Sequence, residues 1–455
     1  MNGRPEQDAA REPRPRHGPE HEGERPYAPP HDLGGRAGHI GVFTFPAYAH
    51  IAPAVPMLAE LVRRGHRVTC FVADRFADLV REAGAEAVVY PSEFPWSDGA
   101  TGSVLDGILD FFAESIAPLE TAVARFRDDP PDLLAHDLAA SEAARLLARA
   151  WDVPVVQLCP TIASSPGFSM SECQAREVTG PPPGPVDPED PAITDFVARK
   201  RRLLTGLGID GAPLDGFGAE DGANIVFLPK AFQVAPETFD DRFAFIGPCL
   251  AEAPATDEGW QPPEGREVLL LSLGSSYTPD QADFLRSCVQ ALADSPWHVV
   301  VTLGHRVTPD ELGPLPDNVE AHRWLRHPEV LRHASAFITH AGMGSVMESL
   351  SYGVPMVLVP YHIDQRVIAR QAADLMLGRV LLREGDTGAE ALRAAVGDVT
   401  TSPGVSAAVA EMRRQVREAG GAARGADAVE SLMRLPGTPT RPRTHEAPPT
   451  EVTHP

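Results

Sequence analysis

The feature that most constrains this chain is a repeated alternation of short apolar runs with segments of helical spacing. The run Ile40–Phe45 is apolar and is followed at once by Pro46. A segment after Pro53 then spaces its apolar residues as a helix does and stops at Gly65, and Val68–Val72 is the next apolar run. Short apolar runs joined through helices are typical of parallel strands buried on both faces. The pattern therefore predicts βαβ units and an α/β fold.

The alternation comes in two series separated by a break rich in proline and glycine, Gly247–Gly265. At 455 residues the chain is too long for one ordinary domain. We therefore predict two Rossmann-like, doubly wound domains facing each other across a cleft. The other strands are expected at Ala87–Tyr90, Leu133–Ala135, Val155–Leu158, Val268–Leu273, His298–Leu303, Ala336–Thr339, Met356–Val359 and Arg379–Leu382. The predicted parts are a disordered extension (1–38), an N-terminal Rossmann-like domain (39–247), a linker (248–266), a C-terminal Rossmann-like domain (267–435) and a disordered tail (436–455).

The composition of the chain limits the kinds of partner that it can bind. The formal net charge of −23 repels polyanions, so we expect neither nucleic acid nor an anionic membrane surface as a partner. Five scattered cysteines without a C-x-x-C pair indicate reduced thiols. The N-terminus is charged and rich in proline, and the chain has no apolar run of the ~20 residues that span a bilayer. We therefore predict a cytoplasmic protein without membrane insertion, either a monomer or a homodimer.

A glycine-rich loop follows the strand expected at Ala336–Thr339 and opens a helix. From His340 it reads H-A-G-M-G-S-V-M-E. Glycines such as Gly342 and Gly344 let the backbone approach a ligand, and the first N–H groups of a helix attract an anion. Ser345 adds a hydroxyl donor, and His340 a ring N–H. The loop therefore predicts an anion site suited to a diphosphate.

Three polar or aromatic features flank that site. Glu348 lies one turn further along the same helix, where a carboxylate would repel phosphate but accept from ribose hydroxyls. Trp324, sixteen residues before His340, offers a face on which a base can stack. Asp364 and Gln365 follow the strand Met356–Val359 and suit sugar hydroxyls. The alternative is a glycine-rich turn whose Glu348 faces solvent, and the neighbouring motifs favour the site over it.

The run from Trp324 to Gln365 resembles the donor-binding signature of the family-1 glycosyltransferases, in the order W, H-x-G-x-x-S-x-x-E, G-V-P and D-Q. It is most similar to that of the bacterial macrolide glycosyltransferases of the GT-B fold, and the likeness extends from His39 to about Leu435. The resemblance implies that Trp324 stacks on the base and that Glu348 binds the ribose. It implies that the transferred sugar is bound by Asp364 and Gln365. The diphosphate would be held by Ser275, His340, Gly342, Gly344 and Ser345. One departure stands out, because this chain has Arg326-His327 where the family usually has Pro-Gln.

Transfer to a hydroxyl needs a base, and histidine suits this task near neutral pH. His50 follows the first strand, in the segment A-H-I-A-P, which resembles the family motif G-H-x-x-P that carries the general base. Asp137 closes the strand Leu133–Ala135 and matches the family's partner carboxylate, which would orient the imidazole. His136 should point to the opposite face of its strand and is interpreted as structural.

The resemblance also implies an inverting transfer of a hexose from a nucleotide-diphosphate sugar, either UDP-glucose or a dTDP-sugar, to a hydroxyl of a small hydrophobic acceptor such as a macrolide or another polyketide. The nucleotide sugar is a co-substrate, and we expect no separate cofactor and no metal. Candidate linings of the acceptor pocket, most of which could equally be core, are Phe94, Trp96, Phe111, Phe112, Phe168 and Met170.

Other interpretations stay open from the sequence. A sugar-nucleotide epimerase would bind the same donor but leave His50 and Asp137 without a role. A non-catalytic, glycosyltransferase-like auxiliary protein should have lost one of these residues or the Asp364-Gln365 pair. A nicotinamide-dependent dehydrogenase is disfavoured, because the first strand-to-helix turn lacks G-x-G-x-x-G.

Overall fold

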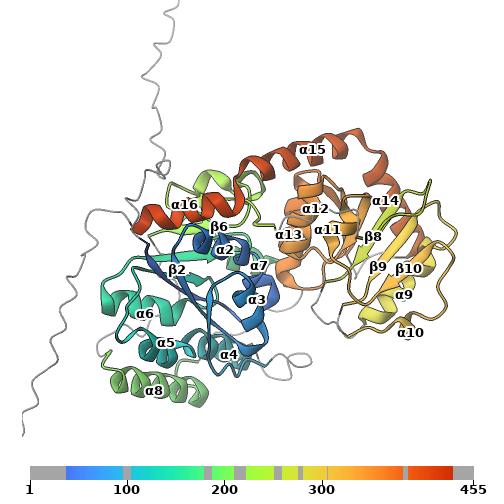
Figure 1. Cartoon of the computed structure of the whole chain (residues 1–455). Coiled ribbons are helices and arrows are strands. Elements are labelled where there is room, and N and C mark those ends of the chain that lie inside the picture. Colours follow the sequence, from blue (N-terminus) through green and yellow to red (C-terminus); the bar gives the residue numbers. More distant parts are fainter. Residues whose placement is uncertain are drawn as a thin grey trace, which may run out of the picture.

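The computed structural model describes residues 37–95, 104–178, 187–209, 222–250, 259–274, 280–304, 306–382 and 388–433. In these ranges the chain forms two α/β domains, each built on one parallel sheet (Figure 1). The predicted pair of doubly wound domains is confirmed.

The N-terminal sheet has seven strands in the order β3-β2-β1-β4-β5-β6-β7, and every pair is parallel. Five of these strands lie where the apolar runs predict them. The short strands β6 and β7 were not predicted, because three residues carry too little pattern. The strands are β1 (His39–Phe43), β2 (Arg67–Val72), β3 (Glu86–Val89), β4 (Leu133–Asp137), β5 (Val155–Cys159), β6 (Asn224–Val226) and β7 (Phe243–Phe245). The helices of this half are α1 (Tyr48–Ile51), α2 (Val55–Arg63), α3 (Ala77–Glu82), α4 (Val104–Ile116), α5 (Leu119–Phe126), α6 (Ser141–Trp151), α7 (Met170–Glu177) and α8 (Pro191–Gly206).

The C-terminal sheet has six parallel strands in the order β10-β9-β8-β11-β12-β13. The strands are β8 (Val268–Ser272), β9 (His298–Thr302), β10 (Val319–His322), β11 (Ala334–Thr339), β12 (Met356–Leu358) and β13 (Gly378–Val380). The helices are α9 (Gln281–Leu292), α10 (Pro309–Leu312), α11 (His327–Leu331), α12 (Met343–Tyr352), α13 (Ile363–Asp374), α14 (Ala389–Thr401), α15 (Pro403–Glu418) and α16 (Gly421–Met433).

Both sheets reverse their strand order at one point. The reversal lies between β1 and β4 in the N-terminal sheet and between β8 and β11 in the C-terminal sheet. In open sheets of this kind, the loops that leave the two strands at the reversal diverge and open a crevice at the carboxyl edge. The loops after β1, β4, β8 and β11 are therefore where the topology places a ligand.

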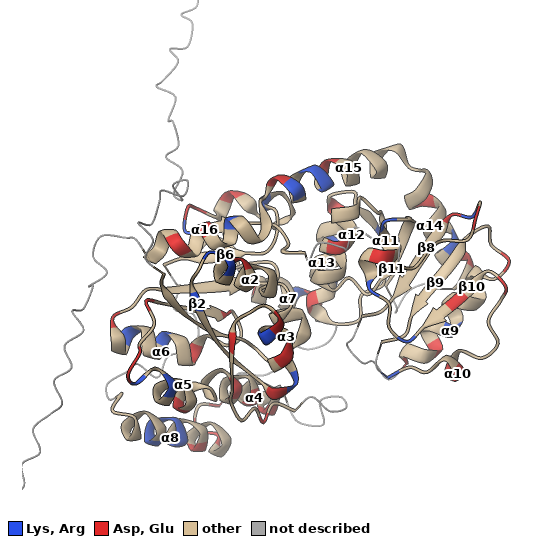
Figure 2. Ribbon diagram, in the orientation of Figure 1, with Lys and Arg blue, Asp and Glu red and all other residues tan. Residues whose placement is uncertain are grey.

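Helices cover both faces of each sheet, as buried parallel strands require. β1 and β8 are buried along their whole length. Figure 2 draws the strands mostly tan, whereas the charged side chains lie mainly on helices and loops. Among the described residues, no helix is long and apolar enough to cross a membrane.

The last helix of the described chain returns to the N-terminal domain. α15 lies against α12 of the C-terminal domain, whereas α16 packs on α2 (Figure 1). Ala426 and Val429 of α16 join the apolar cluster that lies under β1. Arg64 and His66 then pair with Asp427 and Glu430. Residues predicted as part of the C-terminal domain thus complete the core of the other one, while the predicted domain boundaries themselves stay predictions.

Candidate active site

The two residues predicted for proton transfer lie together at the reversal point of the N-terminal sheet. β1 pairs with β4, so the loop after β1 and the end of β4 open at the same edge. Nδ1 of His50, on the short helix α1, lies 2.9 Å from Oδ1 of Asp137. The side chain of Asp137 is buried, whereas that of His50 is 26% exposed. With Nδ1–H donating to the carboxylate, Nε2 keeps its lone pair for an incoming hydroxyl.

The charge around His50 favours its protonated form. Burial lowers its pKa, but the carboxylate of Asp137, through its charge and its hydrogen bond, and the more distant charge of Asp364 outweigh burial and raise the pKa above its ordinary value. Asp137 is held by the backbone N–H of Ala139, which donates to Oδ1 over 2.8 Å. Its Oδ2 is buried without a hydrogen-bond partner among the described residues. Its negative charge is therefore poorly solvated and acts strongly on the imidazole.

The two domains bring their predicted site residues to the same interface. Asp364 is on the first turn of α13, in the C-terminal domain, and its charge acts on His50 of the N-terminal domain. Burial, and then the charge of Glu348 across the same interface, raise the pKa of Tyr48. His50 therefore lies close enough to the C-terminal domain for the charge of Asp364 to act on it.

An aromatic wall lies next to His50. The ring of Phe45 lies 5.2 Å from the His50 ring and stacks on Phe111 of α4 with 5.0 Å between centroids. Phe94 meets both of these phenylalanines edge-on. The candidates Phe94 and Phe111 thus lie on this wall, whereas Phe112 contacts Phe196, Phe168 contacts Phe239, and Met170 belongs to the core. Trp96 lies outside the described residues.

The glycine-rich loop has the predicted form. α12 begins after Gly342 and ends at Gly353, whose φ is +75°. Ala341 also has a positive φ of +66°, a strained conformation for a residue with a Cβ atom, and such strain gathers at ligand sites. The exposed Gly344 and the half-buried Ser345 lie in the first turn of α12, where the helix offers its unpaired N–H groups.

His340 is enclosed by glycines. A Cβ atom on Gly274 would lie 2.4 Å from the His340 ring, and one on Gly342 would lie 2.3 Å from it. Burial, and then the charges of His327 and His362, lower the pKa of His340 to about 3. The ring is therefore neutral at pH 7 and carries one N–H. A hydrogen bond with the backbone of Ser272 acts on its pKa in the opposite direction, and donation of the N–H to a phosphate oxygen stays a prediction.

The carboxylate of Glu348 has a partner that sequence reasoning did not find. Nδ1 of His327 lies 2.8 Å from Oε2 of Glu348, and Nε2 lies 3.1 Å from Oγ of Ser272. Glu348 therefore does not simply face solvent. The one signal in the sequence was the departure at Arg326-His327, and it gave no hint of the partners.

The predicted sugar-binding pair is divided in its roles. Oε1 of Gln365 accepts the backbone N–H groups of Tyr361 and His362, and the residue is buried. Of the polar atoms of the Gln365 side chain, only the amide N–H₂ is thus left for a sugar. The side chain of Asp364, in contrast to that of Gln365, is exposed. Trp324 is 54% exposed, as a stacking platform should be. Ser275 lies outside the described residues.

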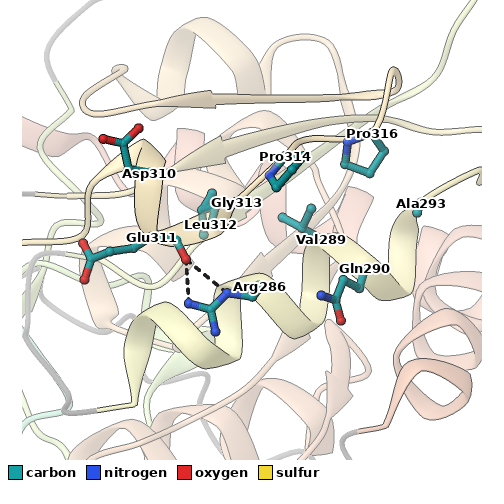
Figure 3. Close-up of a pocket in the computed structure, with 10 residues that line it drawn as sticks. All are labelled: Arg286, Val289, Gln290, Ala293, Asp310, Glu311, Leu312, Gly313, Pro314 and Pro316. Carbon is teal, nitrogen blue, oxygen red and sulfur yellow. Dashed lines mark hydrogen bonds between the residues drawn. The ribbon is translucent and has the colours of Figure 1, made fainter.

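A separate hollow of about 500 Å³ lies on the C-terminal domain between α9 and the α10–β10 segment (Figure 3). Its one cationic side chain, Arg286, already donates to the backbone oxygen of Glu311. None of the predicted site residues lines it. In the described ranges no group of three or more His, Cys, Asp or Glu side chains could hold a metal ion, and metal independence stays a prediction.

Comparison with known proteins shows which family this chain resembles. Residues 214–415 match the family described as UDP-glucoronosyl and UDP-glucosyl transferase. The chain is 37% identical to the oleandomycin glycosyltransferase of Streptomyces antibioticus over 404 residues, which are 87% of this chain and 91% of the relative. It is 34% identical to the demethyllactenocin mycarosyltransferase of Streptomyces fradiae, over 88% of this chain and 87% of the relative. The crystal structure of the calicheamicin glycosyltransferase CalG4 superimposes with a TM-score of 0.75 at 37% identity, over 88% of this chain and 98% of that one.

Proposed function

The chain belongs to the UDP-glucoronosyl and UDP-glucosyl transferase family and is a GT-B glycosyltransferase, and from that premise we propose that it transfers a hexose from a nucleotide-diphosphate sugar to a hydroxyl of a hydrophobic natural product. The transfer proceeds without a metal and inverts the anomeric centre. The observation that carries this proposal is the His50–Asp137 pair, which lies within reach of the charge of Asp364 on the opposite domain.

Nε2 of His50 takes the proton of the acceptor hydroxyl while its oxygen attacks the anomeric carbon. Asp137 fixes the ring through Nδ1–H and stabilises the imidazolium that forms. The bond from the anomeric carbon to the diphosphate oxygen breaks on the far side, so a single in-line displacement inverts the centre. The negative charge that develops on the diphosphate lies at the N-terminus of α12, where free N–H groups stabilise it.

The acceptor class follows from the wall beside the base. Phe111 is 43% exposed and Phe94 is half-buried, and both pack on the buried Phe45, which contacts His50. Such a surface suits an apolar natural product, and two of the relatives are named after the natural products oleandomycin and calicheamicin. Asp364 and the amide of Gln365 favour a fully hydroxylated hexose, because a deoxy position would leave them without partners.

The proposal is tested by replacing His50. His50→Ala should lower kcat by about 10²–10⁴-fold, because the proton then has no acceptor. The dissociation constant for UDP should change less than about twofold, since His50 does not touch the nucleotide. Turnover is measured by mass spectrometry with UDP-glucose and dTDP-sugars against hydroxylated macrolides and polyketides, and UDP binding by calorimetry.

His333→Ala serves as the control, because His333 is a partly buried histidine beside Trp260, outside the site. It should leave both quantities unchanged. Full turnover by the His50 variant would remove His50 as the base. A large loss of UDP binding with little change in kcat would assign His50 to donor binding instead.

A further inference from the structure

His327 is the second residue of the Arg326-His327 pair, at which the donor signature departs from the family pattern. It is the first residue of α11, after Arg326, and lies between the end of β8 and the side of α12. Arg326 turns to Glu329 on its own helix, with 2.7 Å between Nε and Oε1. His327 is thus the member of the Arg-His pair that contacts Glu348 of α12.

The hydrogen bonds around His327 form a relay whose direction can be assigned. The backbone N–H of Gly274 donates to Oγ of Ser272, over 3.3 Å. The Ser272 hydroxyl then donates to Nε2 of His327, and Nδ1–H of His327 donates to Oε2 of Glu348. A carboxylate only accepts, so Nδ1 of His327 carries the hydrogen that Glu348 receives. The relay therefore holds Nδ1 as the donor to Glu348.

The surroundings hold the imidazole in place. The ring meets Phe337 of β11 edge-on with 5.4 Å between centroids. Ser272, at the other end of the relay, is buried. Because both ends of the imidazole are bonded and its edge is packed, Glu348 is held from a rigid support and not by a mobile side chain. Such a support places a ligand group more reproducibly than a free rotamer does.

We infer that His327 is a positioning residue for the ribose of the donor, and that it makes the site prefer a ribonucleoside diphosphate over its 2′-deoxy counterpart. This inference rests on the proposed function, in which Glu348 accepts from the ribose. Because Oε2 is bonded to His327, the carboxylate is restrained from turning to suit a different sugar, and Oε1 is the oxygen left to accept from the ribose. A ribose brings two vicinal hydroxyl donors to a fixed carboxylate, whereas a 2′-deoxyribose leaves part of its acceptor capacity unmet.

The test combines a change in the protein with a change in the ligand and asks whether their effects on binding depend on each other. The dissociation constants of UDP and 2′-deoxy-UDP are measured by calorimetry for the intact chain, for His327→Leu and for His327→Gln. We expect the intact chain to bind UDP about tenfold more tightly than 2′-deoxy-UDP, and His327→Leu to reduce this ratio to about threefold or less. His327→Gln can still donate to Glu348 and should keep most of the ratio. The donor KM should rise in His327→Leu more than kcat falls.

His333→Gln is the matched control, because it replaces a histidine that follows the same helix without contacting the site, and it should keep the ratio of the intact chain. The same ratio in His327→Leu as in the intact chain would overturn the inference. If His327→Leu does not fold, as judged by thermal unfolding, Ser272→Ala breaks the other end of the relay, and an unchanged ratio in that variant overturns the inference equally. Failure of the intact chain to bind any nucleoside diphosphate would instead contradict the proposed function.

Discussion

At the scale of single residues, the pair His50–Asp137 combines two opposing effects. Burial alone would keep the imidazole neutral, and the neighbouring carboxylates reverse this by raising its pKa. A base with a raised pKa is stronger but is protonated over a wider range of low pH. The rate should therefore increase with pH as His50 loses its proton, and level off above its pKa.

Asp137→Asn tests this balance. Removing the carboxylate removes the main cause that raises the pKa of His50, so the acid limb of kcat/KM against pH should move to lower pH. The rate on the plateau should nevertheless fall by about 10²–10⁴-fold, because the imidazolium formed in the transition state loses its counter-charge and the ring its tautomer. The pH profile of kcat/KM measures both effects. A limb that stays in place would mean that another group titrates.

At the scale of elements, the start of α12 is shaped around one side chain. Gly274 after β8 and Gly342 after β11 both leave room for the His340 ring, which a Cβ atom at either position would touch. The two loops come from the strands at the reversal point of the C-terminal sheet. The two glycines therefore set the place of a histidine as much as they let a phosphate approach.

Gly342→Ala should weaken UDP binding by about tenfold or more. Its φ of −64° suits alanine, so the backbone can stay, but the new Cβ would lie 2.3 Å from Nε2 of His340 and must displace the ring. In the double variant with His340→Ala, the glycine change should cost little more, because the clash is gone. Dissociation constants for UDP of the two single variants and the double variant measure this coupling. Fully additive losses would show that Gly342 acts through the backbone alone.

The same elements show what a sequence can predict. Strand-to-helix loops such as His340–Ser345 are visible because glycines and polar side chains follow a buried apolar run at once. The strands β6 and β7 cannot be recognised in the sequence, because each has three residues and no periodicity. The partners of His327 could not be predicted either, since Ser272 and Glu348 meet it only when β8, α11 and α12 pack together. An amphipathic pattern likewise reveals that α16 has an apolar face but not which sheet it covers.

At the scale of the whole molecule, the two domains are tied on one side by packing and by hydrogen bonds. Gln371 of α13 donates to the backbone oxygens of Phe232 and Gln233 in the N-terminal half, and Arg370 pairs with Glu177 of α7. One apolar cluster includes residues of both domains, among them Phe232 and Ile368. These contacts hold α13 against the N-terminal domain and so keep Asp364, at the start of α13, where its charge acts on His50.

The return of α16 to the N-terminal domain should make that domain's stability depend on the C-terminal end of the chain. A Cβ atom on Gly425 would lie 2.6 Å from Sδ of Met57 on α2 and 3.0 Å from Cδ1 of Ile246. Gly425→Leu should therefore overfill this contact and lower the free energy of unfolding by about 1–3 kcal/mol. Gly397→Ala is the matched control, because Gly397 lies inside α14 with open space around its Cβ position, and alanine there should stabilise the protein by about 0.5–1 kcal/mol. Urea unfolding of both variants measures the two effects. A Gly425→Leu variant as stable as the intact chain would mean that α16 rests loosely on α2, and that the C-terminal helix is a cover for the N-terminal domain and not part of its core.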